Sequence, residues 1–307
     1  MSPAEKTGMR QTETERLNRC FTFIFLATAA TILFSRLFSM YQEWEWERRQ
    51  ERLRELKAES EAERPVLTES YNGLPVSGIA LWMKDEDLRK QMVLEAEAAE
   101  PEPPEMLEQY KDLYSQNNDM VGWLFIEGTR VDYPVMQTPE DESYYLSYDF
   151  YGNPDKNGCL VLDSSSDPGE GLDTPSTNLI IHGHTMKSGA MFGQLKRYAD
   201  EEYGREHSVI DFDTLYEERE YDLVCAFYSK VYYENDDVFK YYKFFQADTQ
   251  EELDEWMEGI SGLALYMLDD EAELGDEFLT LSCCSYQTDD GRFVVVAKRR
   301  KDLTQEE

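Results

Sequence analysis

The sequence predicts a mainly β domain with peripheral helices, closed as an eight-stranded β-barrel and preceded by a single transmembrane helix and a charged helical linker. Aromatic residues gather after residue 104, residues 21–40 are almost wholly apolar, and residues 42–104 are dominated by Glu, Arg and Ala. The sequence after residue 104 also holds eight apolar segments bounded by turn residues, a pattern typical of β-strands. These segments are 121–126, 130–136, 158–163, 178–183, 207–213, 220–232, 277–284 and 292–299.

Helical patterns separate some of these strands. We expect a helix at 105–116, where apolar residues recur on one face, and another at 191–200. A third is expected at 249–260, where Thr249 is suited to cap the run that follows. An acidic helical patch is expected at about 85–100.

The apolar segment 21–40 is as long as a membrane-spanning helix, which needs about 20 residues. Aromatic residues follow it, as they do at a membrane interface. We therefore expect a tail at 1–20, an anchor at 21–40, a stalk at 41–104 and a folded domain at 105–307. A cleaved signal peptide is the alternative. Basic residues are balanced on the two sides of the segment, so charge gives no orientation.

The chain is strongly acidic, with 64 Asp and Glu against 30 Lys and Arg and a net charge of −34. Nucleic-acid binding needs clusters of Lys and Arg, which the predicted domain lacks. No nucleic-acid partner is expected, and the acidic surface favours solubility.

The 5 cysteines fit neither a disulfide framework nor a zinc site. Cys159 and Cys225 lie inside apolar strand patterns, where a free Cys behaves as a small core residue. Cys283 and Cys284 end an apolar strand and are the candidates for chemistry.

Strand alternation separates these two neighbours. Cys284 shares a face with Thr280 and Ser282, whereas Cys283 shares the other with leucines. We expect the leucine face to be buried and the hydroxyl face to line a groove, so that Cys284 is the nucleophile. Thr280 and Ser282 are then candidates for substrate binding.

A thiol becomes a strong nucleophile as thiolate, which nearby positive charge favours. His184 follows the strand 178–183, and Arg292 comes eight residues after Cys284. We expect these two residues to supply that charge. A metal held by His182, His184 and the cysteines is not expected, because adjacent cysteines are a poor chelate. No metal or cofactor is predicted, and His207 is given no role.

The segment 280–284, the pair Gly183-His184 and the downstream Arg292 resemble the signatures of the sortases, the membrane-anchored cysteine transpeptidases of Gram-positive bacteria. Several further segments are similar to class B members, and the resemblance covers roughly residues 105 to 300. The added segments are 121–126, 131–137, 144–146, 191–196 and 228–278. Class B sortases carry an added helix between the sixth and seventh barrel strands, and 233–276 resembles that connection.

The resemblance implies a reaction. Cys284 attacks the carbonyl of a Thr-x bond in a Pro- and Thr-containing sorting signal, and His184 protonates the departing amine. An amine of a peptidoglycan precursor or a pilin lysine then resolves the thioester, while Arg292 holds the oxyanion or the substrate backbone. It also implies a single-pass membrane protein with its catalytic domain outside the cell. A thiol hydrolase on the same scaffold and an inactive surface scaffold protein are the alternatives.

The sequence departs from the class B pattern at a few positions. His182 stands where Tyr is common and Cys283 where Thr is usual. The loop 164–175 is longer than typical, and a family Asn near it has no clear counterpart.

Overall fold

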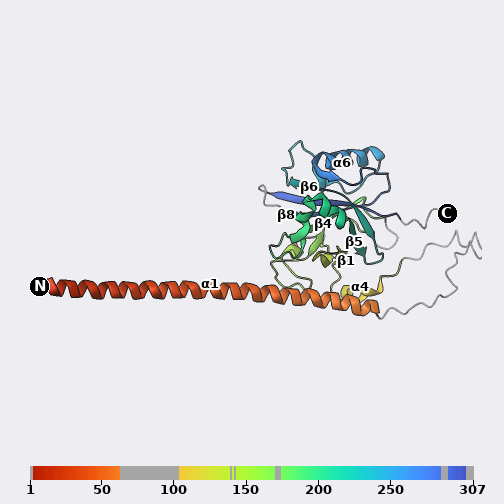
Figure 1. Cartoon of the computed structure of the whole chain (residues 1–307). Coiled ribbons are helices and arrows are strands. Elements are labelled where there is room, and N and C mark those ends of the chain that lie inside the picture. The colour runs from red at the N-terminus through yellow and green to blue at the C-terminus, as the bar shows by residue number, and fades with distance from the viewer. Residues whose placement is uncertain are drawn as a thin grey trace, which may run out of the picture. The chain divides into compact units, whose positions relative to one another are not determined.

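The computed structural model describes residues 3–62, 104–138, 140–141, 143–169, 174–284 and 290–301, with side chains from residue 25 onward except 27. The chain divides into two compact units, residues 1–55 and 56–307. Helix α1 (Pro3–Ala62) makes up the described part of the first unit, and its last turns belong to the second (Figure 1). The first part of the expected charged helical stalk, residues 41–62, lies within it.

Residues 21–40, predicted to be a membrane anchor, lie inside α1. Over the residues that the structure describes, no helix carries a stretch long and apolar enough to cross a membrane. The transmembrane helix is therefore not confirmed. The acidic patch expected at 85–100 lies outside the described residues.

The second unit is built on one sheet, and its described part holds nine strands. In sheet order they run β5-β1-β2-β3-β4-β8-β9-β6-β7, and β5 also pairs with β6. This pairing closes eight strands into a ring, and β7 pairs with β6 beyond the stretch that pairs with β5. The strands are β1 (Met120–Phe125), β2 (Asp132–Met136), β3 (Leu160–Leu162), β4 (Asn178–Gly183), β5 (Val209–Thr214), β6 (Glu220–Lys230), β7 (Ala264–Met267), β8 (Phe278–Cys284) and β9 (Gly291–Arg299).

Each of the eight strands expected from the sequence is present, within a few residues of its expected bounds. The mainly β fold with peripheral helices is confirmed. Strand β7 was not predicted, because it is only four residues long and follows helix α6 directly. Only pairing with the long strand β6 makes this segment extended.

Short helices lie in the connections around the ring of strands. The expected helix at 191–200 is a 3₁₀-helix followed by an α-helix whose N-cap, Asp200, accepts from the Glu202 backbone N–H. The elements are α4 (Glu108–Gln116), η1 (Tyr144–Leu146), η2 (Phe192–Ala199), α5 (Glu201–Glu206), η3 (Tyr241–Lys243) and α6 (Gln250–Leu263).

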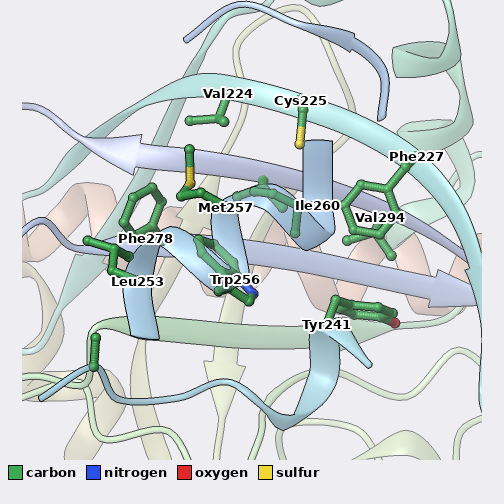
Figure 2. Packing of buried hydrophobic residues seen from close by; sticks show 12 residues of the cluster. Val224, Cys225, Phe227, Tyr241, Leu253, Trp256, Met257, Ile260, Phe278 and Val294 are labelled. Atoms are coloured by element: carbon green, nitrogen blue, oxygen red, sulfur yellow. The ribbon is translucent and has the colours of Figure 1, made fainter. Parts of the chain in front are cut away.

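Helix α6 covers one face of the sheet. It begins with a capping box between Thr249 and Glu252, so the predicted cap is confirmed. Trp256 stacks on Phe244 with ring centroids 4.7 Å apart and meets Phe278 of β8 edge-on at 5.0 Å. Figure 2 shows this apolar cluster, in which α6 and η3 pack over β6, β8 and β9. Elements η3 and α6, both within the segment 231–277, thus form a layer over the sheet face that carries Phe278.

Candidate active site

The strand pairing brings the three predicted catalytic residues to one end of the sheet. Strands β4 and β8 run parallel, with Gly183 paired to Cys283, so the next residues along, His184 and Cys284, leave the two strands side by side. Strand β9 runs antiparallel to β8 and pairs Arg292 with Cys284. Residues paired across strands point to the same face, so all three side chains project on one side. Each is partly exposed to solvent.

His184 is held by its ring and by its backbone. Its Nε2 lies 2.7 Å from the Leu146 carbonyl oxygen. A carbonyl only accepts hydrogen bonds, so Nε2 carries the proton and Nδ1 is the nitrogen left to exchange a proton with a reactant. The His184 carbonyl accepts from the Phe192 N–H at 3.0 Å.

Glycine is required immediately before this histidine. A Cβ at Gly183 would lie 2.6 Å from both the Leu160 and the Phe192 side chains, closer than real Cβ contacts come. The close packing of η2 against the end of β4 therefore depends on Gly183, and it fixes where His184 leaves the strand.

Arg292 has its Nη1 turned toward the backbone, 3.1 Å from the Gly291 carbonyl and 3.4 Å from that of Asp290. A guanidinium has five N–H donors, so these contacts leave donors for a further acceptor. Burial raises the pKa of the Tyr241 phenol, and the positive charge of Arg292 acts in the opposite direction. The positive charge of the Arg292 guanidinium therefore acts on groups at the face of β8 that carries Cys284.

The two neighbouring thiols lie in different environments. Cys283 is 1% exposed, whereas Cys284 is partly exposed, and both are free. Burial raises the pKa of the Cys283 thiol to about 11, so this thiol is protonated at neutral pH. Of the two, Cys284 is the one that a substrate can reach.

The hydroxyl face of β8 differs from the sequence-based expectation. Thr280 and Ser282 are each 1% exposed and do not line an open groove. The Thr280 hydroxyl donates to Asn178 Oδ1 at 2.8 Å, and the Ser282 hydroxyl lies 2.7 Å from that of Tyr241. The layer formed by 231–277 covers them, and sequence alternation alone carries no sign of that layer. Their contact with substrate stays a prediction.

Sequence reasoning missed three residues that support the site. Thr185 donates its hydroxyl to the Cys284 carbonyl at 2.6 Å, and Leu146 and Tyr241 make the contacts described above. Thr185 could have been suspected because it follows the Gly-His pair. Leu146 acts through its carbonyl, and Tyr241 comes from a distant connection, so neither leaves a signal in the local pattern.

Comparison with known proteins identifies this arrangement. The model of the sortase domain matches residues 124–300. Sortase B of Listeria monocytogenes is 29% identical over 196 residues, which are 63% of this chain and 75% of that protein. Sortase B of Staphylococcus aureus is 28% identical over 199 residues, which are 62% of this chain and 74% of that protein. The crystal structure of sortase B from Bacillus anthracis in complex with AAEK1 aligns with a TM-score of 0.55 at 30% identity, covering 66% of this chain and 89% of that one.

The domain match spans more than half of the chain, so the chain belongs to the sortase family and is a cysteine transpeptidase. The relatives and the structural neighbour named above are all sortases B, and the chain is accordingly a class B member of that family.

Proposed function

We propose that this chain joins a protein that carries a Pro- and Thr-containing sorting signal to an amine of the cell wall or of a pilin, with Cys284, His184 and Arg292 as the catalytic residues. The observation that supports this assignment is the strand register. It leaves these three side chains at the ends of neighbouring strands and on one face of the sheet.

In the first half of the reaction, the Cys284 thiolate attacks the carbonyl carbon of the scissile peptide bond. The oxyanion that forms accepts hydrogen bonds from Arg292, whose charge and multiple donors suit it. As the C–N bond breaks, the departing amine takes a proton from His184 Nδ1, while Nε2 keeps its hydrogen bond to the Leu146 carbonyl. The acyl group is left on sulfur as a thioester.

In the second half, an incoming amine attacks the thioester carbonyl. Its nitrogen loses a proton to His184 Nδ1, the C–S bond breaks, and Cys284 is released as thiolate while a new amide bond is formed. If water attacks instead, the product is a free acid and the chain acts as a hydrolase. The two outcomes differ only in the nucleophile that reaches the thioester.

The test is incubation of the protein with a library of sorting-type peptides, with and without a peptidoglycan-like amine, and analysis of the products by mass spectrometry. We expect a peptide–amine conjugate that requires Cys284. Cleavage that yields only free acid at saturating amine would replace the transpeptidase with a hydrolase. Absence of any product dependent on Cys284 would overturn the proposal.

Arg292 is tested by Arg292→Lys, which keeps the charge but loses the planar set of donors. We expect kcat/KM to fall on the order of 100-fold. Arg205→Lys is the matched control, since Arg205 pairs with Glu201 on the surface of α5. Equal activity of the two variants would remove Arg292 from the mechanism.

Membrane attachment through 21–40 with the catalytic domain outside the cell is a separate proposal. It is supported by the apolar composition of that segment and by the aromatic residues that follow. Fractionation of cells, with protease access from outside, tests it. Recovery of the full-length chain in the soluble fraction would contradict it.

A further inference from the structure

A second imidazole lies beside the candidate site, and the reaction above does not use it. His182 precedes His184 by two residues and therefore projects on the same face of the sheet. In the parallel ladder of β4 and β8 it pairs with Ser282, two residues before Cys284. Neighbouring strands are about 4.8 Å apart and rise about 3.3 Å per residue, which puts the Cα atoms of His182 and Cys284 about 8 Å apart.

Asp163 fixes the orientation of this imidazole. Its Oδ2 lies 3.0 Å from His182 Nε2, and its Oδ1 accepts from the Ser165 N–H at 3.0 Å. Burial alone raises the pKa of the Asp163 carboxyl, but these hydrogen bonds and the charge of Lys243 hold that pKa below its usual range. The carboxylate is therefore ionised and accepts a hydrogen bond from the Nε2–H of His182.

The loop that carries Asp163 is held in place by hydrogen bonds from the Gln137 side chain. Gln137 Nε2 donates to the Asp163 carbonyl at 2.9 Å and to the Ser166 carbonyl at 2.7 Å. Asp163 thus comes from a fixed backbone, and the ring of His182 is held by a carboxylate that does not move freely.

The other ring nitrogen is left for a ligand. Nδ1 of His182 has no hydrogen-bond partner among the residues that the structure describes, and the side chain is 31% exposed. In the tautomer that donates Nε2–H to Asp163, the lone pair of the ring is at Nδ1. The ring is therefore a fixed acceptor beside the reactive thiol.

We propose that His182, oriented by Asp163, is a specificity-determining residue. Its Nδ1 accepts a hydrogen bond from a donor side chain of the sorting peptide. This inference rests on the proposed function, because it assigns a recognition role within the same site. An extended peptide rises about 3.3 Å per residue, so the separation of about 8 Å corresponds to two or three residues from the scissile bond. An amide or hydroxyl side chain at that position is the chemistry that His182 selects.

The experiment compares wild-type protein with His182→Phe on peptides that differ at one position at a time. For the wild type we expect a preference for an amide or hydroxyl side chain over an isosteric apolar one, two or three residues from the scissile bond. In His182→Phe this preference should fall by about 10-fold through KM, the usual contribution of one hydrogen bond, while kcat is little changed. His182→Gln, which keeps an amide acceptor, should retain part of the preference.

Asp163→Asn tests the positioning role. It should weaken the same preference less than His182→Phe does, and the double variant should match His182→Phe alone, because Asp163 acts through His182. His207→Phe is the matched control, since that ring stacks on Tyr203 and bonds to the Tyr203 carbonyl.

Alkylation of Cys284 by iodoacetamide separates failure of this inference from failure of the proposed function. If the wild type forms no product dependent on Cys284, the proposed function fails and this inference fails with it. In another outcome, the wild type is active and Cys284 is alkylated normally in the variants. If His182→Phe and His182→Gln then keep the wild-type preference at every peptide position, His182 does not recognise the peptide. A uniform fall in kcat on all peptides, with slowed alkylation, would likewise overturn the inference in favour of a structural role.

Discussion

Cys284 and Arg292 are direct partners across the antiparallel ladder of β8 and β9. Arg292 comes eight residues after Cys284 in the sequence, β8 ends at Cys284, and β9 begins at Gly291. A hairpin of this kind fixes the guanidinium-bearing residue relative to the thiol-bearing one by main-chain hydrogen bonds, so their spacing does not depend on side-chain packing. The third candidate, His184, enters from β4 on the other side of β8.

The first prediction concerns the two adjacent cysteines. Cys284→Ala should abolish acyl-enzyme formation, and Cys283→Ala should retain it, because Cys283 is buried and burial raises the pKa of its thiol to about 11. Cys283→Ala should cost about 1 kcal/mol of stability, as small core truncations do. Intact mass after exposure to a sorting peptide distinguishes the two. A thioester adduct on Cys284→Ala, or its loss in a folded Cys283→Ala, would reverse the assignment.

The second prediction concerns Thr185, whose hydroxyl donates to the Cys284 carbonyl at 2.6 Å. Thr185→Val keeps the shape of the side chain and removes this bond, so the end of β8 is less well fixed. We expect kcat/KM to fall by about 5-fold to 10-fold, in line with a hydrogen bond of about 1 kcal/mol. Thr185→Ser should restore most of the activity.

The matched control for Thr185 is Thr138→Val, since the Thr138 hydroxyl also donates to a carbonyl, that of Asp141, at 2.7 Å. The rate of acyl-enzyme formation is measured for each variant. If Thr185→Val and Thr138→Val react at the same rate, the bond to the Cys284 carbonyl has no part in catalysis.

Much of the fold could be predicted from the sequence because each strand of the ring is marked by its own residues. Val294, Val295 and Val296 form an uninterrupted β-branched run, and all three are fully buried. The junction of β4 and β8 is different, because Gly183 and Cys283 are 100 residues apart in the sequence and pair in parallel. Local pattern carries no information on such a pairing. The resemblance to sortases implied only that His184 and Cys284 act in one site.

The polar face of β8 shows where local reasoning fails. Alternation correctly separates Thr280 and Ser282 from the leucines, but whether a face meets solvent depends on what else the chain puts there. Here Tyr241, more than thirty residues away along the chain, takes the Ser282 hydroxyl as its partner. Strand-level patterns therefore predict a nucleophile, Cys284, but do not predict the buried residues that support the site.

A third prediction follows from a pair of like charges on neighbouring strands. Asp211 of β5 stands opposite Glu220 of β6. Burial, together with the negative charges of Glu220 and Asp213, raises the pKa of Asp211 to about 6. A carboxyl with a raised folded-state pKa contributes stability when protonated, and that contribution is lost as the pH rises from about 4 through about 6.

Asp211→Asn removes this loss. The variant should gain in Tm relative to wild type as the pH rises from 4.5 to 7.5, and the gain should level off above about pH 7. Thermal unfolding across this range gives the difference, with Asp270→Asn, an exposed position, as the control. A difference in Tm that does not vary with pH would show that Asp211 titrates normally.

The last prediction concerns the buried contact between Tyr241 and Ser282, whose hydroxyl oxygens lie 2.7 Å apart. The two side chains are 2% and 1% exposed, so neither hydroxyl has ready access to water. Tyr241→Phe and Ser282→Ala each leave one buried hydroxyl without this partner, and each should cost about 1–3 kcal/mol of unfolding free energy.

Removing both partners together leaves no orphaned hydroxyl, so the double variant should be destabilised by less than the sum of the two single variants. Chemical denaturation of the four proteins gives this coupling, which we expect at about 1 kcal/mol. Tyr233→Phe, at a residue 86% exposed, is the control and should be neutral. Strict additivity would mean that the connection carrying Tyr241 is not held to β8 by this bond. Because Ser282 lies two residues before Cys284, a measured coupling would show that the layer over the sheet stabilises the strand that carries Cys284.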